Sequence, residues 1–173
     1  MAIQQCLVLI KPDGIVKSLT GNIISVLSEL KMKIVGAKMI RVDRALAEMH
    51  YEKHKGKEFY ERLIEYLTGK LNFHTNRVLA LVYEGNNAIA QIREHVGDKN
   101  PEAATPNSIR GKYGRVNSKT GVFENVVHAS DTSEEAEREI KLWFKPCELA
   151  NVIYPTKTEE VAKKELVWAQ GKV

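Results

Sequence analysis

The sequence lacks several features that define other classes of protein. Its 173 residues contain no run of about 18 apolar residues, so we expect no segment to span a membrane. The first residues lack a basic start followed by a long apolar stretch, so we expect no secretory signal. No internal repeat, low-complexity tract or linker precedes Pro146, and one compact domain is therefore the simplest organisation.

Cysteine is scarce, with two residues in the chain. Cys6 lies in an apolar run, where we expect a small buried thiol. Two cysteines in a chain of this length favour a reducing compartment over a disulfide framework, so the sequence predicts a cytoplasmic protein. The net charge of +4 and the pI near 9.0 suit a partner that carries phosphates, but the basic residues are scattered.

The sequence motifs of several enzyme classes are also missing. There is no G-x-x-x-x-G-K-[ST] phosphate loop and no H-R-D or D-F-G element, which disfavours ATP-dependent kinases of those folds. His50 and His54 are four residues apart, as in one pair of zinc ligands. However, no glutamate directly follows His50, as the H-E-x-x-H pattern requires, so a zinc hydrolase is a weak alternative.

Hydrophobic periodicity predicts strands that alternate with helices. Buried or half-buried strands are expected at residues 6–10, 34–42, 78–83 and 122–129. Helices are expected at 21–31, 44–54, 57–67, 88–96 and 133–144, the last opened by Ser133 as its cap. Pro12-Asp13-Gly14 predicts a turn after the first strand. The polar segment 97–121 is too long for a plain connector, which favours a functional loop.

The sharpest candidate for chemistry is His128, at the end of the last predicted strand. A typical imidazole has a pKa of about 6.5 and is largely uncharged at pH 7. An uncharged imidazole can attack phosphorus and carry a phosphoryl group as a covalent intermediate. Taken alone, a histidine with a satisfied hydrogen bond and no catalytic role is the commoner case.

Cations occur where a phosphate group could be bound. Lys11 follows the first predicted strand, Arg93 lies on a predicted helix, and Arg110 lies in the long polar segment. Phosphoryl transfer depends mainly on positioning and charge stabilisation, and the forked guanidinium of arginine suits phosphate oxygens. The ordinary alternatives are a solvated turn lysine, an exposed helix arginine and a salt bridge within a loop.

Taken together and in order, the motifs of this chain resemble those of the nucleoside diphosphate kinase family. The resemblance runs from residue 3 to about 150 and implies a ferredoxin-like α+β sandwich, in which helices cover a four-stranded antiparallel sheet. It separates a kinase-like domain at 1–150 from a tail at 151–173, whose amphipathic segment 157–170 predicts a helix packed on the domain or on a neighbouring subunit. The matching motifs are KPDG at 11–14, HY at 50–51, F-x-x-x-L at 59–63, VYEG at 82–85, Arg93, NP at 100–101, IRG at 109–111, NVVHASD at 125–131, EREI at 137–140 and LWF at 142–144.

The resemblance implies the reaction ATP + NDP ⇌ ADP + NTP, by a ping-pong route through phosphorylated His128. Glu139 would orient the imidazole, and Ser130 would belong to the same hydrogen-bond network. Tyr51 would contact His128 or the transferred group, and Lys11 would assist the transfer. The alternatives are a solvated glutamate, a serine that only starts the next helix and a tyrosine of the core.

The resemblance also implies how the nucleotide is held. Lys11 and Asn125 would bind the sugar hydroxyls, and Phe59 would stack on the base, which tolerates any base. Leu63 and Val122 would line the base or sugar side. Plain core packing is the alternative for Phe59 and Leu63. The phosphates would be held by Arg93 and Arg110.

Magnesium and self-association are implied as well. Mg²⁺ would bridge the substrate phosphates, and no cluster of carboxylates is visible for it, which is acceptable because Mg²⁺ often remains on phosphates and waters. We expect a homo-oligomer, and the sequence leaves open whether it is a hexamer or a tetramer.

The chain departs from the family pattern at several positions. Lys99 stands where many members have a phosphate-contacting threonine, and we expect its charge to replace that contact; the alternative is a solvent-exposed lysine. Asn107-Ser108 replaces the usual Gly-Thr, and Ala129 replaces a frequent glycine. Segments 69–76 and 117–121 resemble insertions, and the second lies close to the expected site.

One non-enzymatic alternative is a nucleotide-sensing or nucleic-acid-binding module on the same fold, which the basic pI would favour. An inactive relative would be expected to lack His128, Lys11 or a phosphate-binding arginine, and all are present. Nucleic acid is therefore a possible partner that the sequence does not predict. A phosphoenzyme that depends on His128 would distinguish the enzyme from the module.

Overall fold

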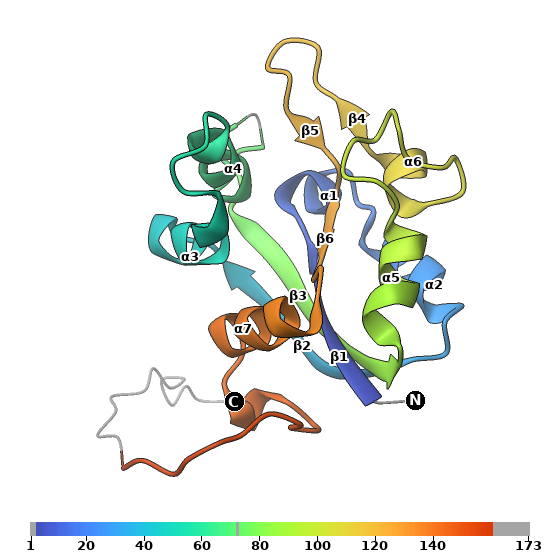
Figure 1. Cartoon of the computed structure of the whole chain (residues 1–173). Coiled ribbons are helices and arrows are strands. Elements are labelled where there is room, and N and C mark those ends of the chain that lie inside the picture. The colour runs from blue at the N-terminus through green and yellow to red at the C-terminus, as the bar shows by residue number, and fades with distance from the viewer. Residues whose placement is uncertain (1–2, 72, 161–173) are drawn as a thin grey trace, which may run out of the picture.

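The centre of the molecule is a four-stranded sheet in which every strand pairs antiparallel to its neighbours. The computed structural model describes residues 3–71 and 73–160 (Figure 1). Helices cover both faces of the sheet, which confirms the predicted α+β sandwich. The strands lie in the order β2 (Lys33–Arg41), β3 (Arg77–Asn86), β1 (Ile3–Ile10) and β6 (Val127–Ala129).

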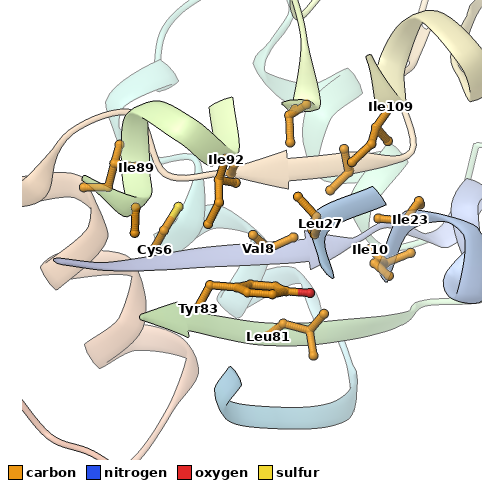
Figure 2. Packing of buried hydrophobic residues seen from close by; sticks show 14 of the residues in the cluster. Cys6, Val8, Ile10, Ile23, Leu27, Leu81, Tyr83, Ile89, Ile92 and Ile109 are labelled. Atoms are coloured by element: carbon orange, nitrogen blue, oxygen red, sulfur yellow. The ribbon is translucent and has the colours of Figure 1, made fainter. Parts of the chain in front are cut away.

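Alternate residues of β1 build the two halves of the core, because side chains in a strand point to opposite faces. Val8 and Ile10 pack against α2 (Thr20–Ser28) and α5 (Ala88–Val96), as Figure 2 shows. Leu7 and Leu9 face the opposite way. Their half of the core includes residues of α3 (Arg44–His50), α4 (Tyr60–Leu67) and α7 (Ser133–Trp143). Burial on both faces explains why residues Cys6 to Ile10 of this strand are all apolar.

The last predicted strand, 122–129, is wrong as a single element. It is divided into β5 (Phe123–Glu124) and β6, and the break lies at Val126, whose φ is +56°. A β-branched residue rarely adopts this left-handed conformation. The backbone here is held by Asp13, whose carboxylate accepts from the Val126 amide at 3.0 Å, and by the Lys11 amide, which donates to the Val126 carbonyl at 2.9 Å. Asp13 belongs to a short helix, α1 (Pro12–Val16), where a turn was predicted.

Other helix boundaries also differ from the predicted ones. The helix predicted at 44–54 ends at His50 and continues as a 3₁₀ turn, η1 (Glu52–His54), while the next helix begins at Tyr60. The cap of α7 is Thr132 and not Ser133, since the Thr132 hydroxyl accepts from the Glu135 amide at 3.2 Å. A single-residue shift of this kind is hard to predict where several capping residues adjoin.

The polar segment 97–121 is partly ordered as secondary structure. It contains α6 (Ile109–Tyr113) and β4 (Arg115–Val116). Ser108, which departs from the family pattern, caps α6 by accepting from the Gly111 amide at 3.1 Å. The segment 117–121 is the turn of the β4–β5 hairpin, which projects beyond the sheet in Figure 1. The Thr120 carbonyl accepts from Arg62 of α4 at 3.3 Å, so the hairpin contacts that helix.

The chain after α7 runs through η2 (Pro146–Glu148) and then packs along the domain. The Ala150 amide donates to the Val35 carbonyl at 2.7 Å, and the Asn151 amide group donates to buried Glu84 at 2.6 Å. Of the predicted tail helix at 157–170, residues 157–160 are not helical, and 161–170 lie outside the described residues. None of the helices in the described part of the chain has the length and apolarity needed to cross a bilayer.

Candidate active site

His128 is the middle residue of β6, opposite Leu9 of β1, and 17% of its side chain is exposed. Its Nε2 atom lies 3.0 Å from Oε2 of Glu139, which is buried on α7. The same carboxylate oxygen accepts from the Ser130 hydroxyl at 2.6 Å, and that hydroxyl accepts from the Leu7 amide at 3.2 Å. The structure therefore brings together the three residues predicted to form this network.

The charge of Glu139 determines which ring nitrogen of His128 is free. Burial alone would raise the pKa of Glu139, but attraction and a hydrogen bond from His128, with smaller contributions from His50 and Ser130, lower it to about 2. An ionised carboxylate only accepts hydrogen bonds, so Nε2 carries the hydrogen. In the uncharged ring, Nδ1 then keeps its lone pair and is available as a nucleophile.

The ring of His50 packs against the ring of His128. Its ring centroid lies 4.6 Å from that of His128, and its Nδ1 accepts from the Trp143 indole at 3.2 Å. Burial is the main cause that lowers the pKa of His50 well below its usual value, so the ring is uncharged. His50, His128 and Glu139 place ligand atoms within 4.8 Å of one another, whereas His54 is outside that group. The zinc pattern considered for His50 and His54 is therefore not formed.

Lys11 is buried, with 5% exposure, which contradicts the alternative of a solvated turn lysine. Its ammonium donates a hydrogen bond to the Asn125 side chain and lies 4.5 Å from the centre of the Tyr66 ring. Burial lowers the pKa of Lys11 to about 7, against the opposing effect of Asp13. A lysine with this pKa changes its charge within the physiological pH range. It can donate a proton to a phosphate or, while charged, stabilise the phosphate's negative charge.

Arg110 is fixed beside the His128 strand by backbone carbonyls. Its guanidinium donates to the Val127 carbonyl at 3.0 and 3.3 Å and to the Gly97 carbonyl at 2.9 Å. Burial lowers the pKa of Arg110 to about 10, which leaves it charged at neutral pH. Arg93 on α5 is more exposed and pairs with the carboxylate of Asp131, three residues after His128. Both predicted phosphate-binding arginines are thus anchored to the segment that carries His128.

The remaining predicted residues surround this centre in different ways. Tyr51 is buried with its ring 4.7 Å from that of His50, and burial raises its pKa, so the hydroxyl keeps its proton. Phe59 is 47% exposed, which excludes plain core packing for it. Leu63 is half-buried against the core, as its alternative predicted. Val122 is half-buried in the hairpin, and Lys99 is exposed, with its carbonyl accepting from Asn125 at 2.8 Å.

The sequence reasoning missed Asp131 and Lys53 as members of the site. The Lys53 ammonium lies 3.3 Å from Asp131 and 3.1 Å from Glu135. Asp131 was part of the motif at 125–131, but its contacts depend on α5 and η1, which are distant along the chain. His50 was considered as a zinc ligand and as part of the HY motif at 50–51, but neither pattern indicated that its ring packs against that of His128.

Comparison with known proteins gives the same family throughout. The family model described as nucleoside diphosphate kinase matches residues 4–149. A nucleoside diphosphate kinase of Pyrococcus furiosus is 47% identical over 147 residues, which cover 85% of this chain and 86% of the relative. One of Sulfurisphaera tokodaii is 43% identical over 149 residues, covering 86% and 94%.

Solved structures agree with these sequence relatives. The nucleoside diphosphate kinase of Halobacterium salinarum in complex with CDP has a TM-score of 0.77 and 34% identity, covering 88% of this chain and 95% of that one. The Borrelia burgdorferi enzyme, a transition state mimic with bound vanadate and ADP, has a TM-score of 0.77 and 31% identity, covering 88% and 93%. The chain belongs to the nucleoside diphosphate kinase family.

Proposed function

We propose that this chain transfers the terminal phosphoryl group of ATP or another nucleoside triphosphate to a nucleoside diphosphate through phosphorylated His128. The observation that carries the proposal is the hydrogen bond between Nε2 of His128 and ionised Glu139, which leaves Nδ1 of a partly exposed ring free. The Nδ1 lone pair attacks the γ-phosphorus while the bond to the β-phosphate oxygen breaks. A β-phosphate oxygen of the second nucleotide then attacks the same phosphorus, and the P–N bond breaks.

The surrounding cations support stabilisation of the transferred group. Arg110 is oriented by carbonyls before any substrate binds, so little rearrangement is needed as charge develops. Lys11 is buried and can supply a charge or a proton to the leaving oxygen. Tyr51 keeps its proton and can donate a hydrogen bond to the phosphoryl group. Arg93 is exposed enough to bind another phosphate group of the nucleotide.

The nucleoside would lie between the segment that joins α3 to α4, which carries Phe59, and the β5–β6 segment. Exposed Phe59 supports stacking on the base, with Leu63 and Val122 beside the base or sugar. The Asn125 side chain already contacts Lys11 and the Lys99 carbonyl, and both Asn125 and Lys11 are proposed to bind the sugar hydroxyls. Stacking on a single aromatic ring would accept different bases.

Phosphoryl transfer in this family uses a divalent cation, and we propose Mg²⁺. The residues grouped here for the phosphates are mainly cationic, so they fit a metal that arrives on the nucleotide with its own waters. Bound Mg²⁺ would neutralise part of the negative charge of the nucleotide's phosphates.

We further propose a homo-oligomer, a hexamer or a tetramer, that acts in the cytoplasm. Support comes from β2, which lies at one edge of the sheet and exposes 45% of Ile34 and 52% of Met39. The kinase domain would comprise residues 1–150, with a tail at 151–173 that packs on the domain or on a neighbouring subunit. The hydrogen bond from Asn151 to Glu84 supports packing on the domain. A sizing measurement would determine the assembly.

Incubation with γ-labelled ATP tests the central proposal. We expect an acid-labile, alkali-stable phosphoenzyme whose label is discharged by any nucleoside diphosphate. His128→Ala should abolish the label and reduce turnover by at least about 10³-fold. The control variant His95→Ala, on α5, should be labelled and turn over as the wild type does. Label that persists in His128→Ala would contradict the proposal, as would tight single-stranded nucleic-acid binding without any phosphoenzyme.

A further inference from the structure

The carboxylate of Asp131 binds two cations that come from different parts of the chain. One of its oxygens accepts from Arg93 of α5, and the other lies 3.3 Å from the ammonium of Lys53 in η1. Lys53 is also 3.1 Å from Glu135 in the first turn of α7, which keeps its side chain directed toward this carboxylate. A single carboxylate therefore holds Arg93 and Lys53 close together.

This cluster is close in sequence to the reacting histidine, because Asp131 lies three residues after His128, and it includes Arg93, one of the proposed phosphate-binding residues. Burial alone would raise the pKa of Asp131, but the positive charges of Arg93 and Lys53, with a smaller effect of His128, lower it. Lys53 directly precedes His54, whose ring is 5.6 Å from that of Phe59. The ion pair of Lys53 with Asp131 thus connects the segment before Phe59 to the segment that carries His128.

The ion pairs within the cluster are weak enough to exchange. Exposure of the side chains is 44% for Arg93, 49% for Asp131 and 37% for Lys53. Ion pairs at such exposure contribute between zero and about 1 kcal/mol each. A di- or triphosphate offers more charge and more acceptor oxygens than one carboxylate, so it competes well for the same two cations.

We propose that Asp131 is the internal counter-ion of the nucleotide-free site and that Lys53 is a further phosphate-binding residue. When a nucleotide binds, its phosphates replace the Asp131 carboxylate on both Lys53 and Arg93. The inference rests on the proposed function and adds to it a cation that the family resemblance did not supply. It also explains how Arg93 and Lys53 can lie close together, because the Asp131 carboxylate offsets their mutual repulsion.

The test is the dissociation constant of ADP, measured by titration calorimetry in EDTA at low and at high ionic strength. Lys53→Gln should weaken ADP binding by roughly fivefold at low salt, equal to the loss of about 1 kcal/mol. Its affinity should also depend less on salt, because one screened contact is gone. Lys55→Gln is the matched control on the same segment and should bind as the wild type does.

Asp131→Asn separates phosphate binding from a purely structural role of Lys53. Removing the counter-ion should tighten ADP binding, and adding Lys53→Gln to Asp131→Asn should still weaken it. If Lys53→Gln matches Lys55→Gln, or if its effect disappears in the Asp131→Asn background, the proposal is overturned. Labelling with γ-labelled ATP is run on every variant, so that a failure of the His128 chemistry in the wild type is recognised separately.

Discussion

The buried carboxylate of Glu139 accepts a 3.0 Å hydrogen bond from Nε2 of His128, which joins helix α7 to the central residue of β6. This contact sets both the orientation of the imidazole and the position of its hydrogen. It also couples catalysis to stability, because the same carboxylate is held ionised in the folded protein.

Glu139→Gln should slow phosphoenzyme formation by roughly 10- to 100-fold, in the range seen when a group that orients a functional histidine is removed. An amide no longer requires the hydrogen to sit on Nε2, so Nδ1 is a nucleophile in only part of the molecules. Rapid-quench labelling would measure the rate. Glu137→Gln, on the exposed face of the same helix, should leave it unchanged.

The same substitution should alter stability in acid. The lowered pKa of Glu139 contributes stability that is present above its ordinary value of 4.5 and is lost as the pH falls toward 2. Denaturant unfolding of the wild type should therefore weaken more steeply over this range than that of Glu139→Gln. Equal slopes would show that the buried carboxylate is not held ionised.

Lys11 should make nucleotide binding depend on pH near neutrality. Its pKa of about 7 in the folded protein means that the ammonium is lost as the pH rises from 6 to 8. We expect ADP affinity to fall over this range in the wild type and to be weak and nearly constant in Lys11→Gln. Calorimetric titrations in buffers of equal ionic strength would measure both.

Lys11 also gives a prediction for stability, and as for Glu139 the stability should rise with pH, because folding lowers both pKa values. Burial penalises the charged form in the folded state only, so its destabilising effect is complete below pH 7 and is relieved between about 7 and 10.5. The free energy of unfolding of the wild type should rise relative to that of Lys11→Gln across this window. A constant difference between the two proteins would count against the burial of this charge.

Lys99→Ala should raise the Michaelis constant for nucleotides several-fold if its ammonium contacts phosphate. The side chain is exposed, and its backbone is fixed by the hydrogen bond from Asn125, so the substitution should not disturb folding. Steady-state kinetics provide the measurement, with Lys33→Ala on β2 as a control for a lost surface charge. Unchanged kinetics would mean that Lys99 points to solvent.

Val126 provides a test of backbone strain beside the reacting histidine. At φ +56°, glycine avoids a penalty of about 1 kcal/mol that any other residue incurs. Both Val126→Ala and Val126→Gly lose the buried side chain, so the glycine variant should be the more stable by about that amount. At Val127, in β6, the same pair should show the reverse order, since glycine weakens a strand. Denaturant unfolding of the four variants would measure both differences in stability.

The sequence predicted the main strands and helices better than the segments that join them. The apolar strands β1 and β3 and the helix α5 were recognised because periodicity and local propensity both indicate them. The split between β5 and β6 was not, since nothing local forces Val126 into a left-handed conformation. That conformation is held by Asp13, more than a hundred residues away in the chain, which accepts from its amide.

By itself, the sequence determined the family, the fold and the identity of the candidate groups at the site, because these follow from residue types in a fixed order. Only the tertiary structure decided their chemical state. Lys11 has a lowered pKa because packing removes it from water, Glu139 stays ionised because His128 and Ser130 meet it there, and Asp131 joins Arg93 to Lys53 because α5 and η1 converge. Desolvation and charge pairing depend on distances in space, which spacing along a chain does not specify.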